Sequence, residues 1–121
     1  RLRKDGKIEA RSPDGPVERG APKHTDPATD WPDAAWYDYT LTFDNGTTAG
    51  VAVINHPKNP PTLWHNHTGL RMLNPCIVAP AAVTLKAKEP LTLRYRVVAH
   101  DGRADTLVLD PLADEWAKSG N

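Results

Sequence analysis

The chain has 121 residues, of which 39% are hydrophobic and 25% are charged, a composition that excludes a typical disordered chain and a typical membrane protein. Its 15 basic and 15 acidic residues cancel, so the overall charge gives no indication of a nucleic-acid or anionic-membrane partner. No apolar run approaches the ~20 residues that a spanning helix needs. The length suits one domain, and the single cysteine, Cys76, excludes an internal disulfide.

The N-terminal quarter of the chain is polar and rich in turn-forming residues. Residues 1–30 contain four prolines and three glycines, which favour irregular backbone over packed elements. We predict an irregular arm or loop there, with a short strand near 6–11. The chain begins at Arg1 without an initiator methionine, so we expect a fragment or a processed product.

The first strong strand signal begins at Trp36. Residues 36–43 are rich in aromatic and β-branched side chains, and Asp44-Asn45-Gly46 follows as a hairpin turn because Asn and Gly tolerate positive φ. Residues 47–54 are the expected return strand, and their apolar run 51–54 could be buried on both faces. Prolines make residues 55–61 a loop.

The second half of the sequence contains fewer predicted elements with clear boundaries. Residues 63–73 fit a short strand followed by a turn at Gly69. Residues 82–87 and 91–99 are expected to form a second hairpin around Lys88-Glu89-Pro90, with Arg94, Arg96 and His100 on one face of its second strand.

The C-terminal tail is expected to be helical. Asp110 is placed to cap the helix, Pro111 suits its first position, and Gly120 can end it. Leu112 and Trp116 lie four residues apart, so one side of the helix can dock on the sheet. The expected fold class is mostly β: an antiparallel sheet or β-sandwich with a short C-terminal helix.

Histidines are the strongest candidates for chemistry. His56, His65 and His100 are expected to be acid/base or hydroxyl-contacting groups, since imidazole suits proton transfer near neutral pH. His65 and His67 form an H-x-H pair that could hold Zn, Fe or Cu if His56 or His100 supplied a third ligand. No carboxylate lies near this pair in the sequence, so we predict no tightly bound metal and no cofactor.

Several polar or aromatic residues around these histidines are candidates for contacting a substrate. Paired guanidiniums suit an oxygen-rich ligand, an indole can stack on a sugar, and side-chain amides match vicinal hydroxyls. Exposed ion pairs and asparagine-proline turns are the alternative structural roles. The candidate substrate-binding residues are Asn59, Trp64, His67, Asn74, Arg94 and Arg96.

Other chemistries have little support. The only serines, Ser12 and Ser119, lie in peripheral segments, which argues against a Ser-His-Asp hydrolase. Cys76 lies beside Ile77 and Val78, which favours a small buried residue over a nucleophile. No pair of opposed carboxylates typical of a glycosidase is visible in the sequence.

From Trp36 onward the chain resembles the PmoA family, labelled "methane oxygenase PmoA" and also filed as a domain of unknown function (DUF6807). The resemblance covers roughly two-thirds of the chain. It rests on Ala35–Tyr39, on the stretch from Gly50 to Pro60 with its H-P-x-N-P block, on Trp64-His65, Gly69-Leu70 and Asn74-Pro75, and on Leu93–Gly102 with its L-R-Y-R-V-x-x-H-D-G block. The family tends to carry arginine where this chain has His67.

This resemblance implies a larger protein than the chain itself. Family members are about twice as long or longer, so residues 31–121 would be the C-terminal part of a large β-sandwich similar to galactose-mutarotase-like domains, which bind carbohydrate. Members often come from bacteria that degrade polysaccharides and often carry export signals, which implies a periplasmic or extracellular location. Membrane methane monooxygenase consists of transmembrane helices, so we interpret the oxygenase label as transferred from an unrelated protein.

Three functional hypotheses follow. The first is a carbohydrate-active enzyme, with epimerisation, hydrolysis and lyase chemistry left open. The second is a non-catalytic sugar-binding module, and a carboxylate close to His56 or His65 would favour the enzyme over it. The third is a metal-dependent oxygenase built on His65 and His67. The first assumes that the loop after residue 54 and the strand before residue 101 line one pocket.

Overall fold

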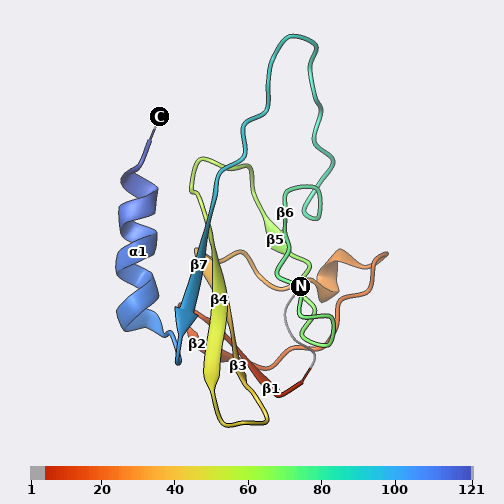
Figure 1. Cartoon of the computed structure of the whole chain (residues 1–121). Helices are drawn as coiled ribbons and strands as arrows, with labels where there is room; N and C mark the ends of the chain where they lie inside the picture. Colours follow the sequence, from red (N-terminus) through yellow and green to blue (C-terminus); the bar gives the residue numbers. More distant parts are fainter. Residues whose placement is uncertain (1–4, 121) are drawn as a thin grey trace.

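A computed structural model describes residues 5–120; residues 1–4 and 121 lie outside the described part. The largest element is a five-stranded antiparallel sheet in the order β2-β1-β3-β4-β7. Its strands are β1 (Lys7–Ser12), β2 (Gly15–Val17), β3 (Trp36–Thr42), β4 (Thr48–Asn55) and β7 (Tyr95–Asp101). The helix α1 (Thr106–Lys118) covers one side of this sheet, which we call the helix face (Figure 1).

The opposite side, the loop face, is covered by irregular chain. This layer contains a 3-10 turn (Pro27–Thr29) and a small hairpin of β5 (Leu63–Trp64) and β6 (Pro75–Cys76) (Figure 1). The mostly-β fold class with one C-terminal helix is confirmed. Besides the five-stranded sheet, the described residues form only the β5–β6 sheet, whose strands have two residues each. They form no second large sheet of a sandwich. No helix in residues 5–120 has the length and apolarity to cross a bilayer.

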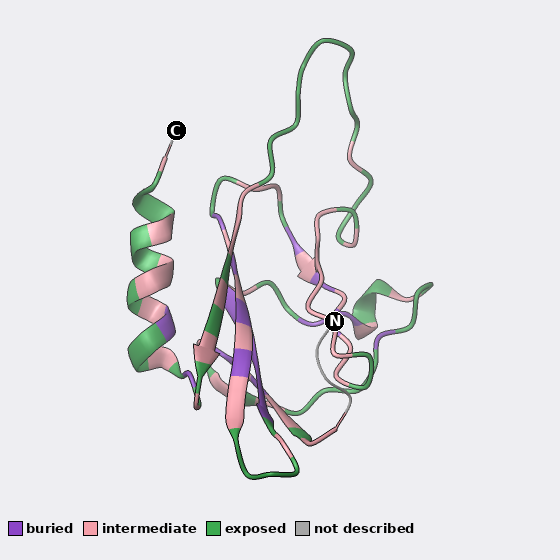
Figure 2. Ribbon diagram, in the orientation of Figure 1, coloured by how far each residue is buried: buried purple, intermediate pink, exposed green. Residues whose placement is uncertain are grey.

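The first predicted hairpin is confirmed, and it separates two cores. Along β3 successive side chains alternate between faces, so Trp36, Asp38 and Thr40 lie on the helix face while Tyr37 and Tyr39 lie on the loop face. The loop-face core contains Tyr37, Tyr39, Leu41, Ala10, Trp31 and Trp64. The helix-face core contains Trp36, Ala52, Ile54, Ala104 and Leu109, and buried residues concentrate along the sheet accordingly (Figure 2).

The N-terminal segment differs from the irregular arm that we predicted. β1 pairs along its length with β3, from Lys7 opposite Thr42 to Arg11 opposite Asp38, and β2 extends the sheet at its edge. The short strand expected near residues 6–11 is therefore present, and residues 7–17 belong to the sheet. The composition of residues 7–17 did not indicate these strands, because pairing with β3 stabilises a strand that has few large apolar side chains.

The predicted second hairpin is wrong in its first strand. Residues 77–94 contain no strand and form a long, mostly exposed loop (Figure 2). β7 begins at Tyr95 and pairs with β4 instead, from Asn55 opposite Tyr95 to Ala49 opposite Asp101. The predicted alternation holds within β7, where Arg96, Val98 and His100 lie on the helix face.

The helix begins five residues earlier than expected. Its N-cap is Asp105, whose carboxylate accepts the Leu107 N–H at 3.0 Å, and Pro111 lies inside the helix. Packing accounts for this start, because Leu109 is fully buried and the Trp36 indole N–H donates to Asp110 at 2.8 Å. The docking of Leu112 and Trp116 on the sheet is confirmed.

Candidate functional site

The three candidate histidines occupy three separate environments. His100 lies on the helix face, in the sheet. His56 follows β4 and packs against the end of α1. His65 follows β5 in the layer that covers the loop face. The single pocket that would unite them is not formed by the described residues, because the sheet separates His65 from His100.

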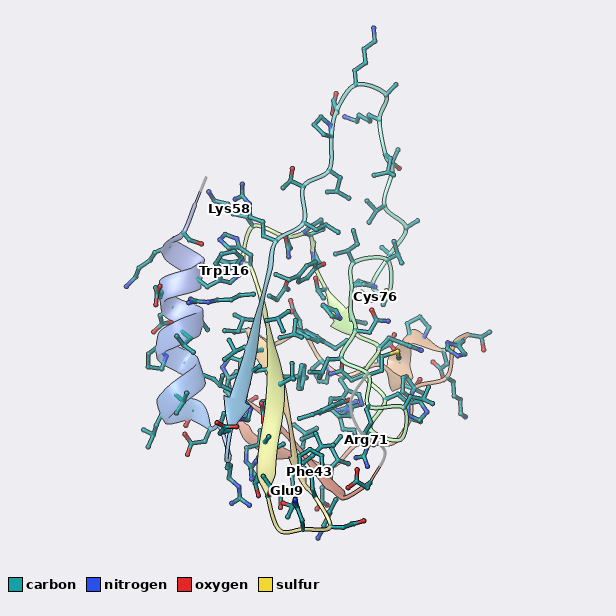
Figure 3. All side chains as sticks on the ribbon, viewed as in Figure 1. Glu9, Phe43, Lys58, Arg71, Cys76 and Trp116 are labelled. Carbon is teal, nitrogen blue, oxygen red and sulfur yellow. The ribbon has the colours of Figure 1, made fainter. Side chains whose placement is uncertain are left out.

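His56 connects the loop after β4 to the end of the helix. Its ring is fully buried and packs edge-to-face on Trp116, with ring centroids 5.3 Å apart. Its Nε2 lies 2.8 Å from the Ser119 carbonyl, and its Nδ1 accepts the Lys58 N–H at 3.1 Å. Figure 3 shows Lys58 and Trp116 close together at this end of the molecule. Nε2 of His56 thus joins the loop to the end of α1, and Nδ1 forms a hydrogen bond within the loop itself.

His100 forms a buried pair with a carboxylate on the central strand. Its Nε2 lies 2.5 Å from Asp38 Oδ1, and its Nδ1 lies 2.9 Å from the Gly102 carbonyl. A carbonyl can only accept, so Nδ1 carries a proton, and the short contact to Asp38 needs another. The pair is therefore imidazolium with carboxylate, or imidazole with carboxylic acid.

Burial governs the chemistry of Asp38. The residue is 0% exposed, and desolvation raises its pKa, while hydrogen bonds from Thr40 and His100 act in the opposite direction. Glu9 (labelled in Figure 3) lies at the neighbouring edge, where a hydrogen bond from Arg11 lowers its pKa. Arg103 also donates to Glu9 at 3.0 Å. The helix face thus holds two polar groups, Asp38 with Thr40 and His100, and Glu9 with Arg11 and Arg103.

His65 is the one of the three that contacts both a carboxylate and a second histidine. Its Nδ1 lies 2.5 Å from Asp30 Oδ1, and its Nε2 lies 3.0 Å from Nδ1 of His24, which is exposed. The rings of His24 and His65 are stacked with centroids 4.8 Å apart. Asp30 is buried, so the three side chains form a hydrogen-bonded chain from the interior to the surface.

Two tryptophans bring Asp30 and His65 together. Trp31 and Trp64 exchange both backbone hydrogen bonds, at 2.8 and 2.9 Å, in an antiparallel bridge. In such a bridge the residue before one partner faces the residue after the other, which brings Asp30 beside His65. Asp30 and His65 are 35 residues apart in the sequence, so no local motif indicated that Asp30 or His24 would lie beside His65. The only sequence signal was that each tryptophan adjoins an ionisable residue.

Trp64 does not have the role of stacking platform that we expected. The side chain is 0% exposed, and its ring packs edge-to-face on Tyr37 with centroids 5.0 Å apart. A ring enclosed in this way offers no face to a sugar. Trp64 therefore positions His65 through its backbone and fills the loop-face core.

Asn59 links the loop after β4 to the start of β7. Its Oδ1 accepts the Arg94 N–H at 2.8 Å, and its Nδ2 donates to the Arg94 carbonyl and to Asn55 Oδ1, both at 2.7 Å. The Asn59 amide thus bonds to both the N–H and the carbonyl of Arg94, as a neighbouring strand would. None of its polar atoms remains unpaired for a ligand.

Replacing Asn59 with alanine is expected to lower the free energy of unfolding by about 1–3 kcal/mol, because both polar groups of the Arg94 backbone lose their partner. Urea unfolding followed by circular dichroism measures this loss. Lys58→Ala removes one exposed hydrogen bond in the same loop and serves as the control, with an expected change below about 0.5 kcal/mol. Equal losses in the two variants would contradict this role of Asn59.

The remaining candidate substrate residues are dispersed. Arg96 lies 3.6 Å from Glu115 of α1 in an exposed ion pair, and Arg94 precedes β7. His67 Nδ1 accepts the Leu70 N–H at 3.2 Å in a tight turn. The Asn74 backbone bonds to Asn66 and His65. Their roles toward a substrate stay predictions, and the structure does not gather them around one ligand.

Metal ligation would need a third group beside the H-x-H pair. Within residues 5–120, no cluster of three or more His, Cys, Asp or Glu side chains is arranged to hold a metal ion. Both ring nitrogens of His65 face Asp30 and His24. Cys76, labelled in Figure 3, is a free, partly buried thiol in the loop layer.

The model of a family of unknown function (DUF6807) matches residues 7–114. No curated protein and no solved structure matches the chain.

Proposed function

The chain belongs to a family of unknown function (DUF6807), and from its own geometry we propose that it contributes an acid/base site acting on a carbohydrate or another hydroxyl-rich small molecule. The observation that carries this proposal is the hydrogen-bonded chain of Asp30, His65 and His24. The substrate class comes from the resemblance to carbohydrate-binding sandwiches and from the match between imidazole groups and sugar hydroxyls.

Asp30 would orient and polarise His65. A buried carboxylate that accepts the Nδ1 proton fixes the tautomer of the imidazole, leaves the lone pair on Nε2, and stabilises the cation that forms when Nε2 takes a proton. The contact is 2.5 Å long and Asp30 has a side-chain exposure of 5%, so solvent competes weakly for it. This carboxylate favours proton transfer over binding alone.

His24 would be the outer end of the relay. With the neutral tautomer just described, His24 Nδ1–H would donate to His65 Nε2, and Nε2 of the exposed His24 would be the terminal base. A proton taken from a hydroxyl at His24 can then be shared with His65, whose positive charge Asp30 offsets. His65 and His24 would transfer protons, and Asp30 would be a positioning residue.

Replacing His65 with glutamine is expected to reduce sugar-processing activity by about 10²–10⁴-fold, the usual contribution of general acid/base catalysis. The activity is sought in three assays: polarimetry of anomer interconversion, nitrophenol release from aryl glycosides, and formation of unsaturated uronate products. Circular dichroism verifies that the variant folds.

Two further variants sharpen this test. Asp30→Asn should lower the rate less than His65→Gln does and should act on kcat more than on KM, since a positioning carboxylate orients its histidine for the proton transfer and does not hold the substrate. Asp44→Asn makes the same change in an exposed carboxylate of the β3–β4 turn, outside the relay, so it should retain the full rate. No activity of the unaltered chain in any assay, or equal rates in the His65→Gln and Asp44→Asn variants, would overturn the proposal.

A further inference from the structure

A cavity of about 650 Å³ lies apart from the Asp30–His65–His24 relay. It is open to solvent and is lined by residues just before β3, by the loop after β4 and by the last turn of α1. Pro57, Pro60 and Pro61 give it rigid apolar walls, because proline cannot change its φ. Its volume is in the range typical of small-molecule sites.

Most polar groups that line the cavity already have partners. His56 uses both ring nitrogens, for Ser119 and Lys58, and the Asn59 amide is occupied by Asn55 and Arg94. Two groups remain for a ligand. Asn55 accepts through Oδ1 and has no protein acceptor for its Nδ2 donors among the described residues, and Asp33 carries a carboxylate.

Asp33 has no cationic partner in the described part of the chain. Its carboxylate accepts only the backbone N–H groups of Ala34 and Thr62. Lys58, the lysine of the adjoining loop, donates instead to the Gly120 carbonyl at 2.6 Å. Asp33 is an exposed residue at the mouth of the cavity, and partial desolvation of its carboxylate there raises its pKa.

We propose that this cavity binds a small hydroxylated molecule carrying a protonated amino group, with the ammonium at Asp33 and a hydroxyl at Asn55. A carboxylate without a countercharge beside apolar walls gains most from a cation that brings its own hydrogen-bond donors. The amide donors of Asn55 then suit a neutral oxygen of the same ligand. The inference does not depend on proton transfer by His65.

The test is isothermal titration calorimetry with two probes that differ in one group. Glucosamine carries an amine where glucose carries a hydroxyl, and the pH is kept low enough to protonate the amine and high enough to ionise Asp33. We expect glucosamine to bind the 121-residue chain at least about tenfold more tightly than glucose, as one charge-assisted hydrogen bond provides.

Variants assign the preference to the cavity. Asp33→Asn retains the shape and the backbone hydrogen bonds, so it should fold and lose the preference for glucosamine. Asp44→Asn removes an exposed carboxylate of the β3–β4 turn and should keep it. His65→Gln should also keep it, which separates this inference from the proposed acid/base function. Equal affinity for the two probes, no binding of either, or an unchanged preference in Asp33→Asn would overturn the inference.

Discussion

Replacing Gly50 with alanine is expected to lower the free energy of unfolding by more than about 3 kcal/mol, beyond ordinary overpacking. Gly50 lies in the middle of β4, between Thr40 of β3 and His100 of β7. A Cβ at this position would lie 2.6 Å from His100 Cε1 and would also collide with the Tyr39 carbonyl oxygen. Neither neighbour can move, because one belongs to a sheet backbone and the other is held by two hydrogen bonds.

Urea unfolding followed by circular dichroism measures the Gly50→Ala effect, and Gly20→Ala is the matched control. Gly20 has open space around its Cβ direction and an ordinary φ, so its substitution should change stability by less than about 0.5 kcal/mol. Adding His100→Ala to Gly50→Ala should not restore stability, because the Tyr39 carbonyl still blocks the methyl group. A Gly50→Ala chain as stable as the Gly20→Ala chain would show that β4 and β7 are not packed as described.

The sequence was most informative where local chemistry decides the structure. The Asp44-Asn45-Gly46 turn specified the β3–β4 hairpin because Gly46 adopts φ 84°, a conformation that few residues accept. The alternation within β7 and the docking of Trp116 followed from side-chain periodicity. These features depend on residues close to one another in the chain.

The sequence was least informative where partners are distant. The predicted strand at residues 82–87 had suitable composition but no partner, since β7 pairs with β4 instead. The start of α1 depended on Leu109 reaching the core and on Trp36 bonding to Asp110 across 74 positions. Likewise, His65 was a candidate from its residue type alone, while Asp30 and His24 became visible only when the Trp31–Trp64 bridge placed them beside it.

Replacing His100 with alanine is expected to cost about 3–5 kcal/mol near neutral pH, the usual penalty for leaving one member of a buried ion pair. Asp38 has no exposed surface and would keep only the Thr40 hydroxyl as a side-chain hydrogen-bond partner. The loss is measured by urea unfolding. His67→Ala, which alters a turn histidine without a carboxylate partner, should cost much less.

The loss of stability in His100→Ala is expected to depend on pH. Burial raises the folded-state pKa of Asp38 above the unfolded value, so the folded protein binds a proton at Asp38 more readily than the unfolded chain does. In His100→Ala the carboxylate loses a stabilising partner, which raises its pKa further. As pH falls through this raised pKa, Asp38 becomes neutral and the buried charge disappears. The stability gap between the unaltered chain and His100→Ala should therefore narrow in acid.

The double variant Asp38→Ala/His100→Ala distinguishes a buried pair from two independent contacts. With both groups removed, no charge remains buried, so the double variant should be more stable than the sum of the two single losses predicts, by about 1 kcal/mol or more. Additive losses, or a His100→Ala penalty independent of pH, would show that Asp38 gains nothing from the imidazole. In that case the H-D-G block would serve only to end β7, and His100 would again be a candidate for contact with a ligand.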